Sequence, residues 1–241
     1  YIEILTAVPG IDTPLARQLL TGIARYTGLH LIAFTVADAA AERARLIDEG
    51  FDPLPLVDLR RAVETAEGGA GEIGFQVLRL APGTMAEGRI QTLTQVTPAL
   101  VWQDRFITRR NAISALSGVL VCTADPGEAA RRFARFTGRP VHGHGRGKGD
   151  TLSIALDRGR LGFAAPQGCR ALLGDIDIPA TPFIAAVALA SGDMAATARY
   201  FDTTRMSYRR IGDTLHVAAT DAMGAALVIH PPDAAWPPLA S

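Results

Sequence analysis

His142 and His144 are the residues whose spacing first suggests chemistry, because a His-x-His pair in an extended segment presents both imidazoles on one side. Arg146 and Lys148 continue this basic stripe, with glycine between neighbours. Two ligands do not complete a catalytic zinc site, which takes three from the protein. The segment also departs from a phosphate-binding loop, because Gly149 follows Lys148 where Ser or Thr is required. The glycines favour a flexible hairpin tip, and an anion or metal site is the alternative.

A second group of candidates follows at residues 102–110. Trp102 and Phe106 could form the wall of a ligand cleft. Arg105 and the arginine pair at 109–110 could hold a substrate carboxylate through bidentate contacts. In the alternative interpretation, which we favour, the two aromatic side chains join two halves of the chain.

Composition and missing motifs exclude several classes of function. The chain of 241 residues has 24 Lys and Arg against 24 Asp and Glu, so it lacks the positive field that collects nucleic acid or anionic membrane. Its two cysteines lie far apart without a CxxC pair, which favours a reduced, cytoplasmic setting. The longest apolar run, residues 183–190, is too short to span a membrane. No HExxH, GxSxG or GxGxxG motif occurs. We therefore expect no nucleic-acid or membrane partner.

Three segments of the chain share one plan, and this repeat is the strongest signal of architecture. In each, an apolar strand leads to an aspartate, Asp38, Asp125 or Asp193, and a helical pattern follows. Aspartate is a favoured N-cap residue, and glycine ends the first two helices at Gly50 and Gly138. Short alternating segments separated by Asp-Gly-type turns come next and predict antiparallel hairpins. Each segment is therefore predicted to be a βαβββ unit.

These units define a domain organisation. We place them at residues 29–96, 112–166 and 183–231. The first half of the chain is residues 1–103 and the second half is residues 112–241, with a linker at residues 104–111.

The start of the chain has its own pattern. Residues 2–8 align with residues 90–96, the last strand of the first unit. We therefore expect residues 1–8 to be a strand that pairs beside that unit, as the tail of a further, partial unit. Residues 14–26 would form the helix that joins the two. Because the chain does not begin with Met and opens inside this strand, we expect more chain upstream.

Two motifs carry a family resemblance, PGTMAEGRIQ at residues 82–91 and TPALVWQ at residues 97–103. They are similar to sequences of glyoxalase-like domains within the vicinal oxygen chelate superfamily, which includes glyoxalases, extradiol dioxygenases and bleomycin-resistance proteins. The βαβββ plan resembles that superfamily too. The resemblance implies an α+β fold in which repeated βαβββ units pair into curved mixed sheets around a cleft, with helices on the outside.

The resemblance also implies a divalent metal that binds two neighbouring substrate oxygens, held by a His on a first strand and a Glu on a last strand. The expected His lies seven residues before the capping Asp. Leu31, Gly118 and Ala186 stand at these positions, and none of them can bind a metal. His30 is one residue out of register and should point to the opposite face of the strand.

On the last strands, Glu3 matches the acidic position, whereas Gln91 occupies it in the next unit. A neutral amide is a poor ligand for a transition metal. We therefore predict that this chain holds no metal tightly at the inherited position. Glu3 is the best single candidate ligand, and His142 and His144 are weaker candidates.

Alternation along the strands of the first unit assigns their faces. Ile32, Phe34 and Val36 are the bulkier apolar set and should pack on the helix. The other face should line the ligand cleft, together with Trp102. Its predicted members are Leu31, Ala33, Thr35, Gln91, Leu93 and Gln95.

The resulting hypothesis is a cytoplasmic glyoxalase-like protein that binds a small organic molecule in a sheet-lined cleft, with lyase, isomerase or dioxygenase ancestry. The alternative is a non-catalytic binding or sequestering protein of the bleomycin-resistance type, which needs only a dry cleft and a few polar anchors. A bound metal would distinguish the two. A homodimer is compatible with both, and the sequence identifies no catalytic residue.

Overall fold

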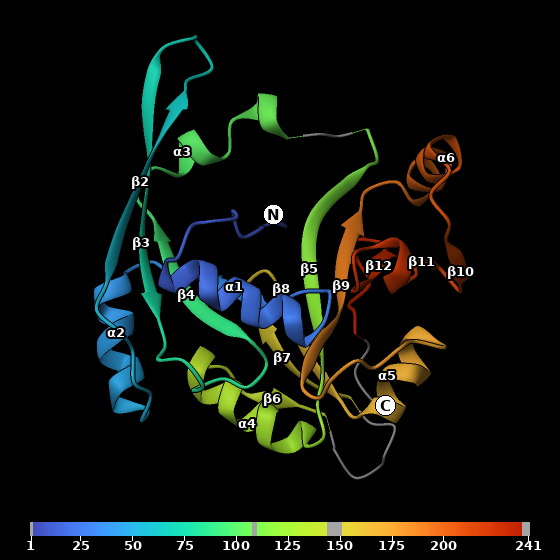
Figure 1. Ribbon diagram of the computed structural model, residues 1–241. Helices are drawn as coiled ribbons and strands as arrows, with labels where there is room; N and C mark the ends of the chain where they lie inside the picture. The colour runs from blue at the N-terminus through green and yellow to red at the C-terminus, as the bar shows by residue number, and fades with distance from the viewer. Residues whose placement is uncertain (1, 108–109, 144–150, 238–241) are drawn as a thin grey trace. The chain divides into compact units, whose positions relative to one another are not determined.

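The computed structural model describes residues 2–107, 110–143 and 151–237 (Figure 1). Contacts divide the chain into two compact units. We call residues 31–109 the small unit, and residues 1–30 with residues 110–241 the large unit. Among the described residues, no helix combines the length and the hydrophobicity that crossing a membrane requires.

The small unit contains a four-stranded sheet with the strand order β1-β4-β3-β2. β1 runs parallel to β4, and the other two pairs are antiparallel. The βαβββ order predicted for residues 29–96 is confirmed. Its elements are β1 (Leu31–Thr35), α2 (Ala39–Asp48), β2 (Val57–Glu64), β3 (Ala70–Arg79) and β4 (Arg89–Gln95), and the short helices α3 (Pro98–Val101) and η1 (Asp104–Phe106) follow.

Helix α2 begins where the sequence predicts, because Asp38 caps it. The Asp38 carboxylate accepts hydrogen bonds from the backbone N–H groups of Ala40 at 2.8 Å and Ala41 at 3.0 Å. Ala39 and Leu46 turn inward and are 0% and 1% exposed. Since α2 contacts β3 and β4, it covers one face of the small sheet (Figure 1).

The register of the small sheet places odd-numbered and even-numbered side chains on opposite faces. Gln91 of β4 lies opposite Ala33 of β1 and opposite Arg79 of β3, and Val77 of β3 lies opposite Val57 of β2. Directly paired residues point to the same side of a sheet, and side chains alternate along each strand. All odd-numbered strand residues of the small unit therefore share one face, which we call the odd-numbered face.

Exposure shows which face α2 covers. Leu78, Ile90 and Thr92 on the even-numbered face are at most 2% exposed. On the odd-numbered face, Ala33 and Thr35 are exposed, whereas Val77 and Gln91 are 3% and 8% exposed. Helix α2 therefore packs on the even-numbered face and leaves the odd-numbered face without this cover.

The large unit contains an eight-stranded sheet with the order β10-β11-β12-β9-β5-β8-β7-β6. Antiparallel pairing of β5 with β9 joins two βαβββ units, as predicted for residues 112–166 and 183–231. The first of these units is β5 (Ile113–Cys122), α4 (Pro126–Thr137), β6 (Val141–His142), β7 (Thr151–Leu156) and β8 (Gly159–Ala164). The second is β9 (Phe183–Ser191), α6 (Met194–Thr204), β10 (Arg209–Ile211), β11 (Thr214–Val217) and β12 (Ala226–His230), with η2 (Ala219–Asp221) before β12. Helices α1 (Pro14–Arg25) and α5 (Pro166–Leu173) complete the unit.

The strand predicted for residues 1–8 is wrong over residues 2–8, the part that the structure describes. These residues are in no strand, and Ile4 is 73% exposed. A strand needs a neighbour that takes up its backbone hydrogen bonds. Among the described strands, β1 has β4 as its one partner, so residues 2–8 do not pair with the outer edge of β1 as expected. The helix predicted for residues 14–26 is confirmed as α1, capped by Thr13.

Candidate functional site

Both faces of the large sheet are covered by other parts of the large unit. Helix α4 packs on one side, where Phe133 lies 5.1 Å from Phe163 of β8 between ring centroids. The opposite face carries a continuous apolar cluster to which α5 and the end of the chain contribute. Members of this cluster include Tyr26, Leu120, Cys122, Cys169, Leu173 and Trp236.

Two glycines show how closely the chain covers this face. A Cβ atom on Gly118 would lie 2.6 Å from the carbonyl oxygen of Trp236, and one on Gly162 would lie 2.3 Å from Cγ of Pro237. Ala186, another predicted first-strand position, is 0% exposed in the same cluster. Gly118 and Ala186, where the resemblance places metal ligands in the large unit, are therefore covered by other residues of that unit.

The two cysteines are buried in this core as free thiols. Both Cys122 and Cys169 are 0% exposed. The hydrogen bond with Cys122, together with burial, raises the pKa of the Cys169 thiol. A thiol that stays protonated is a poor nucleophile.

The small unit presents a polar group on its odd-numbered face. Gln91 lies directly opposite Arg79 on the neighbouring strand. Arg89, two residues before Gln91 on β4, donates a hydrogen bond from Nε to Gln91 Oε1 at 2.9 Å. Gln91 is 8% exposed, so this amide is held in place on a largely buried part of the face.

Arg79 is the member of this group with unused hydrogen-bonding capacity. Its Nε atom is buried and has no hydrogen-bond partner among the described residues. A buried donor without a partner costs about 1–3 kcal/mol. Such a group is satisfied when a ligand atom or water occupies the space beside it.

The predicted cleft residues lie together as the sequence predicts. Leu31, Ala33 and Thr35 of β1 lie opposite Arg89, Gln91 and Leu93 of β4, all on the odd-numbered face. At the other end of this face, the indole Nε1 of Trp102 donates to Gln95 Oε1 at 2.9 Å, and Trp102 is 45% exposed. That these side chains line a ligand site stays a prediction.

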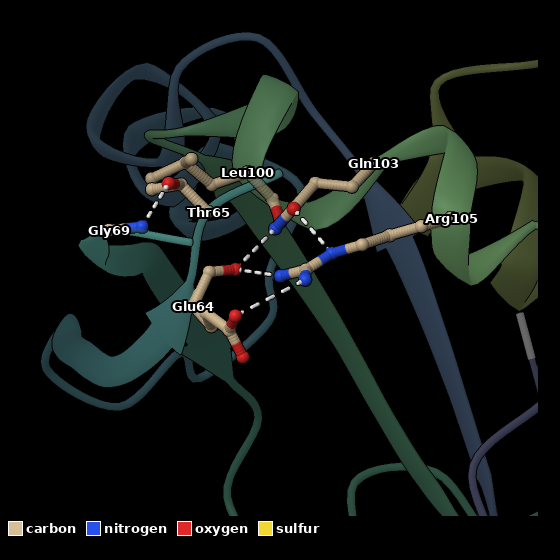
Figure 2. A network of polar contacts seen from close by, with 6 residues as sticks. All are labelled: Glu64, Thr65, Gly69, Leu100, Gln103 and Arg105. Atoms are coloured by element: carbon tan, nitrogen blue, oxygen red, sulfur yellow. Dashed lines mark hydrogen bonds and ion pairs between the residues drawn. The ribbon is translucent and has the colours of Figure 1, made fainter. Parts of the chain in front are cut away.

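The segment that carries Trp102 is fixed to the tip of the β2–β3 hairpin by a polar network (Figure 2). The Gln103 amide donates to the backbone carbonyls of Glu64 at 3.2 Å and Leu100 at 3.0 Å. Arg105 donates from Nε to Gln103 Oε1 at 3.0 Å and also reaches the carbonyl and carboxylate of Glu64. These bonds hold residues 97–106 beside the sheet within the small unit.

Replacing Gln103 with alanine should loosen this segment. Gln103 is 7% exposed, and its loss removes the hydrogen bonds of its amide to the Glu64 and Leu100 carbonyls and the acceptor of Arg105 Nε, at a cost of about 1–3 kcal/mol. Amide exchange of Leu100 and Trp102 should speed up. Gln18→Ala, at an exposed position of α1, is the control and should leave these rates unchanged. Equal rates in the Gln103 variant and the parent protein would contradict the role given to the network.

The other candidates are dispersed. Glu3 is exposed and in no strand, and His142 is exposed in β6. His144 is outside the described residues. The His30 ring lies at the end of α1, with Nε2 2.9 Å from the carbonyl oxygen of Tyr26. Within residues 2–107, 110–143 and 151–237, no three His, Cys, Asp or Glu side chains form a group that could hold a metal ion.

Two further histidines have structural contacts. His230 has Nε2 2.6 Å from Ser117 Oγ and Nδ1 2.7 Å from the Pro231 carbonyl. His216 Nε2 lies 2.8 Å from Thr214 Oγ1, and burial lowers the pKa of the His216 imidazole.

Arg79 and Arg89 are the residues that reasoning from the sequence missed. Arg79 and Arg89 have odd numbers and therefore share the face of Gln91 and Leu93, which alternation had assigned to the cleft. Alternation alone could have placed Arg89 on that face, because it lies on the same strand as Gln91. Placing Arg79 required the register between β3 and β4, which the loop at residues 80–88 sets.

Comparison with protein families supports the fold. A model of the glyoxalase-like domain matches residues 1–137, more than half of the chain. No curated protein matches the sequence.

Solved structures that are similar to this chain have low sequence identity to it. A hypothetical protein from Staphylococcus aureus is 10% identical, with a TM-score of 0.61 over 90% of this chain and 71% of that chain. A Mn(II)-bound glyoxalase from Novosphingobium aromaticivorans is 13% identical, with a TM-score of 0.46 over 83% of this chain and 61% of that chain. A methylmalonyl-CoA epimerase from Mycobacterium tuberculosis is 16% identical, with a TM-score of 0.40 over 54% of this chain and 95% of that chain.

Proposed function

The chain belongs to the glyoxalase-like domain family, and we propose that it binds a small organic molecule on the odd-numbered face of the small sheet. The observation that carries this proposal is the group formed there by Arg79, Arg89 and Gln91. A ligand site combines apolar surface with a few fixed polar groups. In the large unit, the face opposite α4 is covered instead by Trp236 and Pro237.

The family resemblance implies a divalent metal, and the residues of the small unit do not fit one. Leu31 has no donor atom, and Gln91 Oε1 already accepts a hydrogen bond from Arg89. The Arg89 guanidinium would also repel a cation at that place. Glu3, the best single candidate from the sequence, is exposed and in no strand. We therefore propose a metal-free role, the binding or sequestering of a small molecule.

Methyl NMR would test where ligands bind. A mixture of small aromatic fragments, both neutral and charged, should shift the methyl signals of Leu31, Val77 and Leu93, which share the odd-numbered face. The methyl signals of Leu120 and Val228, in the apolar cluster of the large unit, should stay unchanged. Shifts confined to Leu120 and Val228 would refute the assignment.

Metal analysis separates the binding role from an enzyme of the lyase, isomerase or dioxygenase type. Protein incubated with Mn²⁺ or Zn²⁺ and then dialysed should retain a substoichiometric amount of metal. One retained ion per chain would overturn the metal-free proposal and favour an enzyme.

A further inference from the structure

We propose that the ligand of the odd-numbered face is an organic acid whose carboxylate is bound by Arg79, with Gln91 and Arg89 beside it. The inference rests on the proposed function, because it names the chemistry of the ligand for the same face. Guanidinium groups bind carboxylates through paired, charge-assisted hydrogen bonds.

The first argument is the distribution of charge in the small sheet. Its strands contain the acidic residues Asp58, Glu64 and Glu72, all at even positions. Arg60, also even, pairs with Glu72 at 3.6 Å. The remaining arginines of the strands, Arg61, Arg79 and Arg89, are all odd-numbered. The strands therefore give the odd-numbered face positive charge and no carboxylate of their own.

The second argument is the unmatched donor. Arg79 Nε is buried without a partner among the described residues, although Gln91 lies directly opposite on β4. Arg89 uses its own Nε on Gln91. The Arg79 guanidinium therefore keeps one buried donor that a ligand oxygen could satisfy.

The third argument concerns the rest of the ligand. From Arg79 along β3, the next odd-numbered residues are Val77 and Phe75, and Leu93 lies opposite Val77 on β4. These apolar side chains follow directly after Arg79 on β3 and lie on the same face. Val77 is 3% exposed, whereas Phe75 and Leu93 are half-buried. The face therefore suits a molecule with a carboxylate at the arginine end and an apolar body beside Phe75 and Leu93.

Benzoate and benzamide make a matched pair of probes, because they share the ring and differ in charge. Benzoate should shift the methyl signals of Val77 and Leu93, and benzamide should bind at least tenfold more weakly. Arg79→Gln should weaken benzoate binding about ten- to a hundredfold, as expected for a hydrogen-bonded charge pair. Arg79→Lys, which keeps the charge and loses the paired geometry, should fall between. Arg60→Gln, on the even-numbered face, is the control and should bind benzoate like the parent protein.

The outcomes separate this inference from the proposed function. If benzamide shifts the same methyl signals as strongly as benzoate and Arg79→Gln has no effect, the face binds small molecules and the carboxylate inference is wrong. If neither probe, nor any neutral fragment, shifts these signals, both proposals fail. Tighter binding of inorganic phosphate than of benzoate would overturn the assignment of an organic carboxylate.

Discussion

Replacing Phe133 with alanine should lower the free energy of unfolding by about 3–5 kcal/mol. Phe133 is 0% exposed on the inner side of α4. Its ring centroid lies 5.1 Å from that of Phe163 and 6.4 Å from that of Phe136. Alanine would leave a cavity beside the rings of Phe163 and Phe136, and the close-packed core around it would relax only in part.

Urea denaturation followed by circular dichroism would measure the loss. Phe106→Ala is the matched control, because Phe106 is 59% exposed and its ring contact is with the guanidinium of Arg105. That variant should lose about 1 kcal/mol or less. A Phe133 variant as stable as the Phe106 variant would show that packing of Phe133 against the large sheet contributes little to the free energy of unfolding.

The architecture could be predicted because its signals are local. Asp38, Asp125 and Asp193 each accept hydrogen bonds from the first turn of the helix that follows. Gly138 has the left-handed backbone of a helix C-cap, with φ of 64°. Each signal acts within a few residues, so the order of strands and helices follows from the sequence without knowledge of distant contacts.

The covering of the large sheet could not be predicted, because it depends on residues far apart in the chain. Tyr26, Cys169 and Trp236 meet Leu120 on one face of that sheet. No spacing in the sequence connects them. Helix α5 begins at Pro166, after β8, and corresponds to no element of the βαβββ repeat.

Part of the candidate site could be predicted because alternation acts along a single strand, and part could not because it depends on the pairing of two strands. Alternation placed Leu31, Ala33, Gln91 and Leu93 on one face, and the register confirms that they share it. Arg79 entered only when β3 was paired with β4, since pairing adds contacts between residues that alternation cannot relate. The strand predicted at residues 2–8 is wrong for the converse reason. Its sequence alternates, but it pairs with none of the described strands.

Replacing Gly224 with alanine should destabilise the large unit more than the same change at Gly212. Both glycines have positive φ, 89° and 57°, so each variant pays about 1–2 kcal/mol for a left-handed alanine. A Cβ on Gly212 meets nothing within 4 Å, whereas one on Gly224 would lie 1.9 Å from the carbonyl oxygen of Thr27. That oxygen belongs to the backbone, so rotation of a side chain cannot relieve the overlap. The Gly224 variant should therefore lose about 1–3 kcal/mol beyond the Gly212 variant.

The overlap also predicts where the large unit should loosen. Thr27 and Gly28 lie against Gly224, and Leu29 next to them bridges to Ile184 at the start of β9. Moving residues 27–28 away from Gly224 should weaken that bridge, so the backbone amides of residues 27–29 and 184 should exchange faster in Gly224→Ala than in Gly212→Ala. Equal stability of the two variants, with equal exchange at Leu29, would mean that the close approach at Thr27 does not hold this connection in place.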